Sequence, residues 1–441
     1  MKKKIQDGSF KYFFVKFFVD WSVKSSYKKY QVEGIENIPA DGSTIWASNH
    51  TNALMDPLVV LSATPGQKVY MARADIFKKK SALKWLEFLK IIPIYRIRDG
   101  LNSVKKNDEV IAQATDILLD NVPLVIYPEA THRPKHSLLK LSKGIFHIAY
   151  SVYDNSDKNR PVYILPIGLE YGDYFRFRST VLVKFGKPID VSAFIRANDD
   201  EPRPVQMQKL RALLTEKLAE LITFIPDDDD YDVIWEYVKL KAAEKKTFFK
   251  TLKKVESSTG KKLKGLMRNL AVNKSLVDEV IGLREREPKK TGELLYKIER
   301  FRLWRIQNGI SVYSISDEKG WGKILIKFFI MLAGLPYYMF SALASALIWV
   351  PTVILLSRIQ DDAFYNSARF AARFALSPIS FILWTVLYFT FLPWQFALAC
   401  LLLSIPSLRY LYDYGSFARR VLSDLRWKFR KHKAPDYKDL F

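Results

Sequence analysis

Residues 44–57 read TIWASNHTNALMDP, and this stretch is the most informative part of the chain for both fold and chemistry. It begins with a short β-rich run, Thr44–Ser48, and continues into a polar loop that carries His50 and Asp56. Loops at the ends of buried strands often carry the functional residues of an α/β domain, because the sheet holds their ends in place. We therefore expect a functional site directly after this strand.

The same alternation continues from about residue 29 to residue 190, where short β-rich runs are separated by helical stretches. This pattern predicts an α/β domain with a largely buried sheet, to which we assign residues 29–200. The predicted strands are Thr44–Ser48, Val69–Ala72, Leu124–Tyr127, Val162–Leu169 and Thr180–Phe185, and the predicted helices include Ser81–Lys90, Val104–Leu119 and Leu141–Val152.

The flanking regions have a different character. Residues 1–28 combine lysines with aromatic residues at helical spacing, and Lys16 and Asp20 interrupt the apolar stretch that a signal peptide would need. We predict an amphipathic helix in the membrane interface there. Residues 201–322 are rich in Lys and Arg and predict a basic helical connector whose face can rest on anionic headgroups.

Residues 323–410 predict a transmembrane anchor. They contain two long uncharged runs, Phe328–Ser357 and Phe374–Leu408, and each exceeds the roughly 20 apolar residues that a bilayer-spanning helix needs. Prolines within both runs allow two or four crossings. Basic residues precede the first run and fill the tail at 411–441, which predicts that both flanks, and the catalytic domain, lie on the cytoplasmic face.

The overall composition narrows the classes of partner. The 441-residue chain has 69 Lys and Arg against 46 Asp and Glu, a net charge of +23, which favours nucleic acid, anionic lipid or an acidic carrier protein. The apolar runs favour lipid over nucleic acid. The one cysteine, Cys400, excludes an intramolecular disulfide and a cysteine-based zinc cluster.

His50 and Asp56 are the minimum needed to activate a hydroxyl. The carboxylate accepts a hydrogen bond from one ring nitrogen and fixes the tautomer, so that the other nitrogen can take a substrate proton. Taken alone, the pair is better explained by a structural histidine that caps a turn. Further support comes from three later stretches: Ile92–Arg98, Val125–Arg133 and Ile164–Gly168.

Together these four blocks resemble the phospholipid/glycerol acyltransferases, which include 1-acylglycerol-3-phosphate and glycerol-3-phosphate acyltransferases. The similar region covers about residues 30–190, and the blocks occur in the family's order. The matching residues are Asn49, His50 and Asp56 in the first block, Arg96 in the second, Tyr127, Pro128, Glu129 and Thr131 in the third, and Pro166 in the fourth.

The chain departs from the family pattern at several positions. Five residues separate His50 from Asp56, where the family usually has four, and this spacing resembles that of some fungal-type glycerol-3-phosphate acyltransferases. The pair must then meet across a loop-to-helix turn. In the third block Ala130 replaces the usual glycine and His132 the usual arginine, so we transfer the cationic role to Arg133.

The resemblance implies a membrane-bound O-acyltransferase of phospholipid synthesis. His50, oriented by Asp56, would be catalytic, and Arg96, Glu129, Thr131 and Arg133 would bind substrate, without a metal or cofactor. The co-substrate would be acyl-CoA or the acyl form of acyl carrier protein. The expected acceptor is 1-acylglycerol 3-phosphate, giving phosphatidate, with glycerol 3-phosphate as its rival.

Two other classes of function remain open on the residues alone. One is a metal-dependent hydrolase with His50, Asp56 and Glu129 as ligands, a set that would suit zinc or manganese. The other is a non-catalytic membrane adaptor whose basic face binds anionic lipid.

Overall fold

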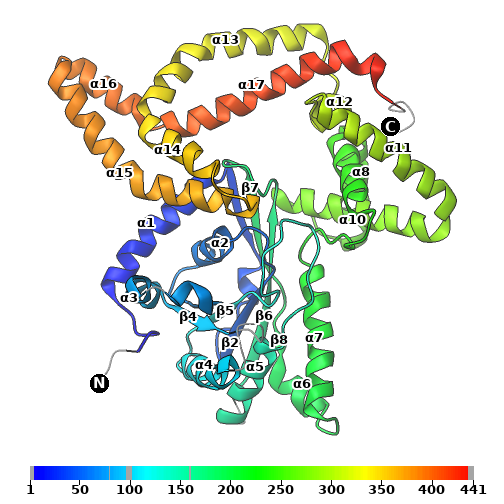
Figure 1. The fold of residues 1–441 in the computed structure, drawn as a ribbon. Coiled ribbons are helices and arrows are strands. Elements are labelled where there is room, and N and C mark those ends of the chain that lie inside the picture. The colour runs from blue at the N-terminus through cyan, green and yellow to red at the C-terminus, as the bar shows by residue number, and fades with distance from the viewer. Residues whose placement is uncertain (1–3, 79, 96–101, 158–159, 436–441) are drawn as a thin grey trace. The chain divides into compact units, whose positions relative to one another are not determined.

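A computed structural model describes residues 4–78, 80–95, 102–157 and 160–435 (Figure 1). The chain divides into two compact units. The first comprises Met1–Ile222 with Asp361–Ser367, and the second comprises Thr223–Gln360 with Ala368–Phe441. The first unit has the α/β architecture that the sequence predicts, and the second is helical, so the predicted fold class is confirmed.

One mixed sheet forms the centre of the first unit. Its order is β1-β7-β6-β2-β5-β3-β4, and β8 pairs with β6. Neighbouring strands are parallel except in the β6–β7 and β6–β8 pairs. The strands are β1 (Lys29–Glu33), β2 (Ser43–Ser48), β3 (Val69–Arg73), β4 (Ile91–Ile94), β5 (Leu124–Ile126), β6 (Val162–Tyr171), β7 (Thr180–Phe185) and β8 (Ile189–Asp190).

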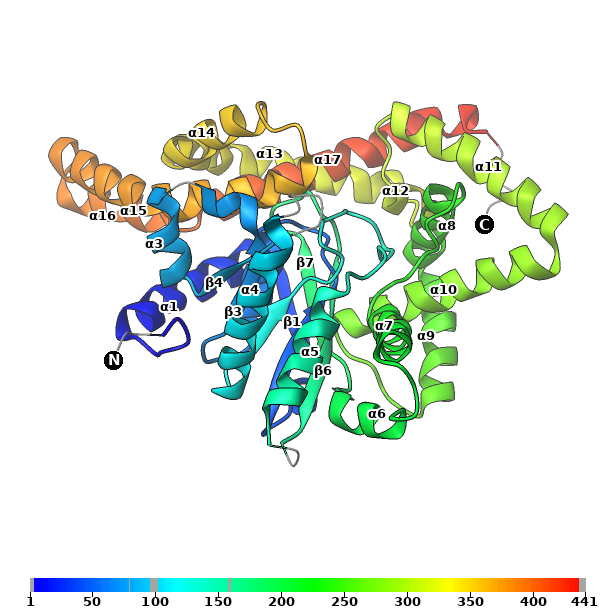
Figure 2. The same cartoon turned by 60° about the horizontal axis from the view of Figure 1, so that its bottom comes forward.

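Successive side chains of each strand point to opposite faces of the sheet, and helices cover both faces. Ile45 and Ala47 of β2 point into a core shared with α4 and α5, which cross this face (Figure 2). Trp46 lies on the opposite face, where α2 and α1 pack on one another. The elements between the strands are η1 (Ile35–Asn37), α2 (Met55–Ala63), η2 (Ala74–Lys78), α3 (Lys80–Phe88), α4 (Asn102–Leu119) and α5 (Gly144–Asn155), and α6 (Val191–Ala197) and α7 (Arg203–Ala219) follow β8.

The first unit extends beyond the 29–200 boundary expected from the sequence. In α7, Leu210, Leu214 and Leu218 recur at the spacing of one helix face and are fully buried in the sheet core. At the other end α1 (Phe10–Ser26) packs against α2. Both helices therefore belong to the compact unit that holds the sheet.

α1 buries polar as well as apolar side chains and exposes several aromatic ones. Its buried face carries Lys16, whose Nζ lies 2.6 Å from Asp20, and Asp20 accepts a hydrogen bond of 3.0 Å from Ser62 of α2. Its exposed side chains are Lys11, Lys24 and a row of large aromatic residues, namely Phe10, Phe13, Phe14, Phe17, Phe18 and Trp21. The helix thus attaches to the domain through polar contacts and through the buried side chains of Tyr12, Val19 and Val23, and it presents an aromatic face away from the domain.

The second unit contains a helical cluster followed by apolar helices. Residues predicted to form a connector pack around a core that includes Val238, Val277, Phe301 and Trp427. The helices are α8 (Tyr231–Ala243), α9 (Lys245–Thr259), α10 (Leu266–Arg286), α11 (Pro288–Gln307), α12 (Val312–Ser316), α13 (Trp321–Ala344), α14 (Ala346–Leu356), α15 (Tyr365–Phe391, after η4 at Asp362–Phe364), α16 (Trp394–Ser404) and α17 (Ser407–Arg430, before η5 at Lys431–Lys433).

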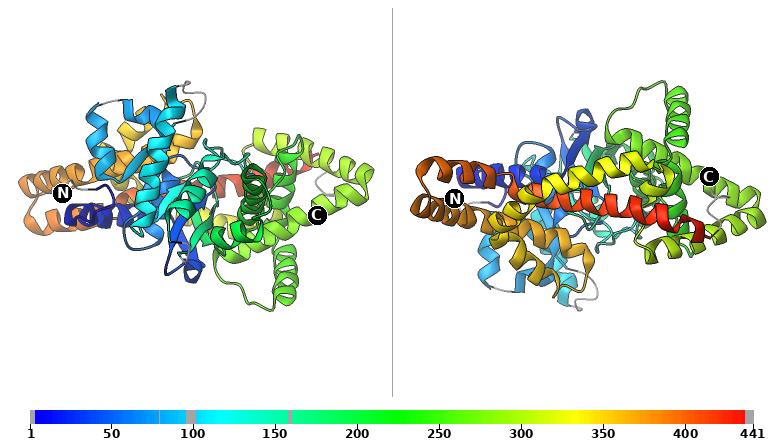
Figure 3. Two further views of the ribbon diagram at one scale, coloured as in Figure 1. Left: turned by 90° about the horizontal axis from the view of Figure 1, so that it is seen from below. Right: turned by 90° about the horizontal axis from the view of Figure 1, so that it is seen from above.

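Two helical segments in the described part of the chain are long and apolar enough to cross a membrane, Trp321–Ala344 and Asp362–Phe391. The bent pair Trp394–Ser404 and Ser407–Lys433 could be a third span. α13 and α17 run side by side (Figure 3), and the Tyr414 hydroxyl donates to the Met331 carbonyl at 2.6 Å. The expected breaks at prolines occur at Pro393 and Pro406, whereas Pro336, Pro351 and Pro378 lie inside helices.

The close approach of Leu221 to β6 requires glycine at position 168. A Cβ added there would lie 2.5 Å from the Cβ of Leu221 and 2.9 Å from its carbonyl oxygen. We predict that Gly168→Ala lowers the free energy of unfolding of the first unit by about 1–3 kcal/mol through overpacking. Gly144→Ala is the matched control, because its added Cβ would meet only Ile94 Cδ1 at 3.6 Å. Chemical denaturation of both variants checks this, and equal midpoints would contradict it.

Candidate active site

The site lies at the edge of the sheet where parallel strands end. β2, β5 and β6 run parallel, with Ala47 opposite Ile126 and Ser48 opposite Ile167. The loops that follow β2 and β5 therefore leave the sheet at the same edge, which is where α/β folds place their functional groups. The first and third sequence blocks meet there, although about 80 residues separate them.

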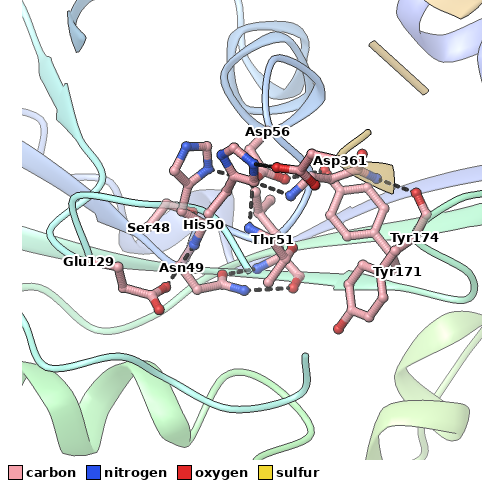
Figure 4. A network of polar contacts seen from close by, with 12 residues as sticks. Ser48, Asn49, His50, Thr51, Asp56, Glu129, Tyr171, Tyr174 and Asp361 are labelled. Carbon is pink, nitrogen blue, oxygen red and sulfur yellow. Dashed lines mark hydrogen bonds and ion pairs between the residues drawn. The ribbon is translucent and has the colours of Figure 1, made fainter. Parts of the chain in front are cut away.

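His50 and Asp56 form a hydrogen-bonded pair in this loop (Figure 4). The His50 Nδ1 lies 2.7 Å from Asp56 Oδ2, and the two side chains are 18% and 0% exposed. The His50 Nε2 makes no hydrogen bond with any described residue, which leaves it accessible to a substrate. This geometry meets the requirement for a general base stated above.

Asp56 is held by further donors. Its Oδ2 also accepts from the backbone N–H groups of Thr51 and Asn52, each at 2.7 Å, and its Oδ1 accepts from the Tyr171 hydroxyl at 2.7 Å. Burial, together with the neighbouring Asp56 carboxylate, raises the pKa of Tyr171, so its hydroxyl stays protonated and donates. With every partner a donor, the carboxylate fixes the Nδ1–H tautomer of His50.

The five-residue spacing is accommodated by a turn before α2. Met55, the first residue of α2, donates to the Asn52 carbonyl at 2.9 Å, and Ala53 adopts a φ of 39°. A positive φ tightens the chain at this point, so Asp56 in the first helical turn faces back toward His50. The prediction that the pair meets across a loop-to-helix turn is thus confirmed in its geometry.

Glu129 ties the third block to the first. Its Oε1 accepts from the backbone N–H of His50 and its Oε2 from that of Leu139, both at 2.8 Å. Burial raises the pKa of the Glu129 carboxyl, and the two backbone donors oppose that rise. The side chain therefore holds the loop that carries His50, and the expected contact of Glu129 with substrate stays a prediction.

Rings enclose His50 on two sides. The Tyr127 ring lies 4.5 Å from the His50 ring at 33° between planes, and the His132 ring lies edge-on at 5.6 Å. His132 Nε2 pairs with Asp361 Oδ2 at 2.9 Å. The imidazole of His50 is thus confined to one orientation by packing as well as by hydrogen bonds.

The other predicted substrate-binding residues have different surroundings. Arg133 donates from its backbone to the His50 carbonyl at 3.0 Å and from Nη2 to the Ser137 hydroxyl at 2.7 Å. Thr131 is exposed, and its side chain makes no hydrogen bond with a described residue. Arg96 lies outside the described residues.

Asn49 joins the first block to β6. Its Oδ1 accepts from the Leu169 N–H at 2.7 Å, and its Nδ2 donates to the Leu169 carbonyl at 3.0 Å. The side-chain amide continues the ladder that β2 makes with β6. Pro166, from the fourth block, is buried in β6 opposite Ala47, which shows its role in core packing.

The backbone conformation of Ala130 accounts for the glycine that the family usually has at this position. Its φ is 58°, in the left-handed region that glycine adopts most readily. Alanine adopts this left-handed conformation at a cost in free energy that glycine does not have.

Sequence reasoning missed Tyr171 and Asp361. Tyr171 ends β6, two residues beyond the predicted strand, and the shared edge of parallel strands could have pointed to it. Asp361 is 229 residues from His132 and lies between two apolar helices, where no local pattern relates it to the site.

The metal-ligand alternative is not supported by this arrangement. Among the residues that the structure describes, no group of three or more His, Cys, Asp or Glu is placed to hold a metal ion. The oxygens of Asp56 and Glu129 that the alternative would use face backbone N–H groups instead.

Part of the chain matches a known protein family. Residues 29–170, within the first unit, match the family model described as Acyltransferase. The resemblance noted in the sequence is confirmed at that level. A search of curated proteins found no match. A similar solved structure is that of the 1-acyl-sn-glycerophosphate (LPA) acyltransferase PlsC from Thermotoga maritima, at 19% identity and a TM-score of 0.34, covering 48% of this chain and 79% of that one.

The double acceptor role of Glu129 generates a prediction. In Glu129→Gln an amide NH2 replaces one of the two oxygens and faces a backbone N–H, which leaves a buried donor without a partner. We expect the free energy of unfolding to fall by about 1–3 kcal/mol, and kcat to fall because His50 loses its anchor. Glu36→Gln, at an exposed position of the same unit, should change neither quantity. A Glu129→Gln variant as stable and active as the parent would contradict this role.

Proposed function

We propose that the protein is a membrane-bound acyltransferase that transfers a fatty acyl group from an acyl thioester to 1-acylglycerol 3-phosphate, giving phosphatidate. The observation that supports the proposal most is the His50–Asp56 pair, in which Nδ1 is bound at 2.7 Å and Nε2 is free of protein partners within the described residues. The acyltransferase family match covers both residues.

In the proposed reaction the acceptor hydroxyl gives its proton to His50 Nε2 as its oxygen attacks the thioester carbonyl carbon. Asp56 stabilises the imidazolium that forms, through the Nδ1–H hydrogen bond. The tetrahedral intermediate then collapses, the carbon–sulfur bond breaks, and the imidazolium protonates the departing thiolate. The products are an ester and a free thiol, and His50 returns to its starting state.

Glycerol 3-phosphate is the rival acceptor, favoured by the five-residue spacing between His50 and Asp56. Either acceptor carries a phosphate, and we propose that Arg96, Arg133 and Thr131 contact it or the glycerol, since guanidinium groups bind phosphate through paired hydrogen bonds. The donor would be acyl-CoA or acyl carrier protein, and the net charge of +23 suits either anionic carrier.

The decisive experiment offers a labelled acyl thioester to the detergent-solubilised protein with each acceptor separately. We predict that transfer to one of them falls by about 10²–10⁴-fold in His50→Ala, and by a comparable factor in Asp56→Asn, where the tautomer is no longer fixed. His147→Ala, at an exposed position of α5, is the matched control and should retain activity.

Each outcome of this assay has a clear meaning. Acylation of 1-acylglycerol 3-phosphate that depends on His50 supports the proposal. A preference for glycerol 3-phosphate would keep the proposed chemistry and make that compound the acceptor. Activity that survives His50→Ala, or that is lost with a chelator, would overturn the proposed chemistry. No transfer to either acceptor with either donor would favour the adaptor alternative.

We also propose that the protein is an integral membrane protein with its catalytic unit on the cytoplasmic face. The apolar helices suit this location by length and composition, and the basic residues of the tail at 411–441 suit a cytoplasmic flank. α1 would lie in the interface, because Phe14, Phe17 and Trp21 are each more than half exposed, and Lys11 and Lys24 of the same helix are exposed and can contact anionic headgroups.

A fluorescent label on α1 tests whether this helix lies in the membrane interface. With Cys400 replaced by serine, Phe17→Cys can carry an environment-sensitive fluorophore, and Glu36→Cys, also exposed, can carry it as a control. In full-length protein reconstituted into bilayers, we predict that brominated lipids quench the label at position 17 strongly and the label at position 36 weakly. Equal, weak quenching at both positions would contradict the interfacial placement.

A further inference from the structure

A short segment remote in sequence lies against the candidate active site. Asp361–Ser367 follows α14 and leads into α15, yet it belongs to the same compact unit as the sheet. Asp361 pairs with His132, and Asn366 donates from Nδ2 to the Tyr174 carbonyl at 2.5 Å. Figure 4 shows Asp361 and Tyr174 within the network around His50.

The two carboxylate oxygens of Asp361 contact different groups. Oδ1 accepts from the Ala363 N–H at 3.0 Å and caps the turn η4, while Oδ2 lies 2.9 Å from His132 Nε2. Burial opposes ionisation of Asp361, but the hydrogen bonds from His132 and Ala363 outweigh it and hold the pKa of this carboxyl below its usual range. The side chain is therefore an anchored anion.

His132 is held between this segment and the catalytic histidine. The Phe364 ring meets it edge-on at 4.9 Å on one side, and the His50 ring meets it edge-on at 5.6 Å on the other. With Nε2 taken by Asp361, its Nδ1 makes no hydrogen bond to any described residue. The His132 side chain is 15% exposed, so a ligand can still reach it.

A second contact links the segment to the loop that holds Asp56. The Tyr174 carbonyl accepts from Asn366 and also from Asn52 Nδ2 at 3.0 Å, and the backbone N–H of Asn52 donates to Asp56. The segment is thus attached to the first and the third block at once. Such attachment at two points fixes its distance from the reacting groups better than either contact alone.

We propose that Asp361 is a positioning residue for acyl transfer, which holds His132 beside His50 so that the free Nδ1 of His132 contacts the acceptor glycerol phosphate. This inference rests on the proposed function. The acceptor, rather than the thioester, is the partner assigned because its hydroxyl must reach His50 Nε2, and its remaining oxygens lie only a few bonds away. An imidazole with one nitrogen fixed presents the other in a defined direction, as a hydrogen-bonding contact requires.

The test compares Asp361→Asn with Asp362→Asn in the full-length protein, using whichever acceptor the wild-type protein acylates. Asparagine can still cap η4, so the first variant removes the carboxylate at His132 while keeping the turn. Asp362 is an exposed neighbour without a hydrogen bond from its side chain to a described residue. We expect Asp361→Asn to lower kcat/KM for the acceptor about tenfold, mainly through KM, the low end for loss of a charge-assisted hydrogen bond because this side chain is 55% exposed.

Two further readouts separate positioning from a merely structural role. The KM for the acyl thioester should be unchanged in Asp361→Asn, and the thermal midpoint should stay near that of Asp362→Asn. In a double-mutant cycle, Asp361→Asn should have no further effect when His132 is already alanine, because Asp361 acts through that ring. Asp361→Glu should restore part of the acceptor affinity.

Failure of this inference is distinguishable from failure of the proposed function. An active wild-type protein whose acceptor KM is the same in Asp361→Asn overturns the inference alone. Effects of Asp361→Asn and His132→Ala that add independently, or that raise the KM of both substrates equally, overturn it as well. A wild-type protein inactive with both acceptors overturns the proposed function first, and the positioning role with it.

Discussion

The carboxylate of Asp56 is completely buried, yet the His50 ring, two backbone N–H groups and the Tyr171 hydroxyl all donate to it. A buried anion is tolerated only where donors replace the water that it has lost. This constraint shapes the whole loop after β2, because the N–H groups of Thr51 and Asn52 must turn inward to meet the carboxylate. Because Nδ1 of His50 donates to this carboxylate, Nε2 is the ring nitrogen that a substrate can contact.

The sheet makes this arrangement possible by bringing distant segments to one edge. The parallel pairing of β2 with β5 and β6 places the loop of His50 beside the loop of Glu129 and beside the end of β6, where Tyr171 lies. Glu129 then connects the loops through backbone hydrogen bonds. A residue that the family resemblance associates with substrate thus has a structural task as well, and mutational loss of activity at Glu129 would not by itself identify a substrate contact.

A segment outside the residues that match the family model also contacts the candidate site. The residues that match the family model end at position 170, whereas Asp361–Ser367 comes from between two apolar helices and joins the first unit. The candidate membrane span Asp362–Phe391 begins within this segment, while Asp361 and Asn366 contact His132 and Tyr174 of the first unit. The proposed acceptor, 1-acylglycerol 3-phosphate, is a lipid, and a connection of this kind would suit its use as a substrate.

The sequence by itself determined the features that depend on local pattern. Alternation and periodicity identified the buried strands β2, β3, β5, β6 and β7 to within two residues at each end, and the long apolar runs identified the helices that could span a membrane. The edge strands β1 and β4 were missed, since KYQVE is half-exposed and charged and IIPI is short and contains proline. The order of the four blocks was enough to point to His50 and Asp56 as a pair, and the structure places the two side chains within hydrogen-bonding distance.

Only the tertiary structure decided which groups surround that pair. Tyr171 lies 115 residues from Asp56 and Asp361 lies 229 residues from His132, and no periodicity extends over such distances. The inward face of α1 and the inclusion of α7 in the first unit were likewise decided by packing, because a helical pattern shows that a face is buried but not what buries it. Side-chain roles such as that of Glu129 depend on the direction in which each oxygen points, which a one-dimensional pattern does not contain.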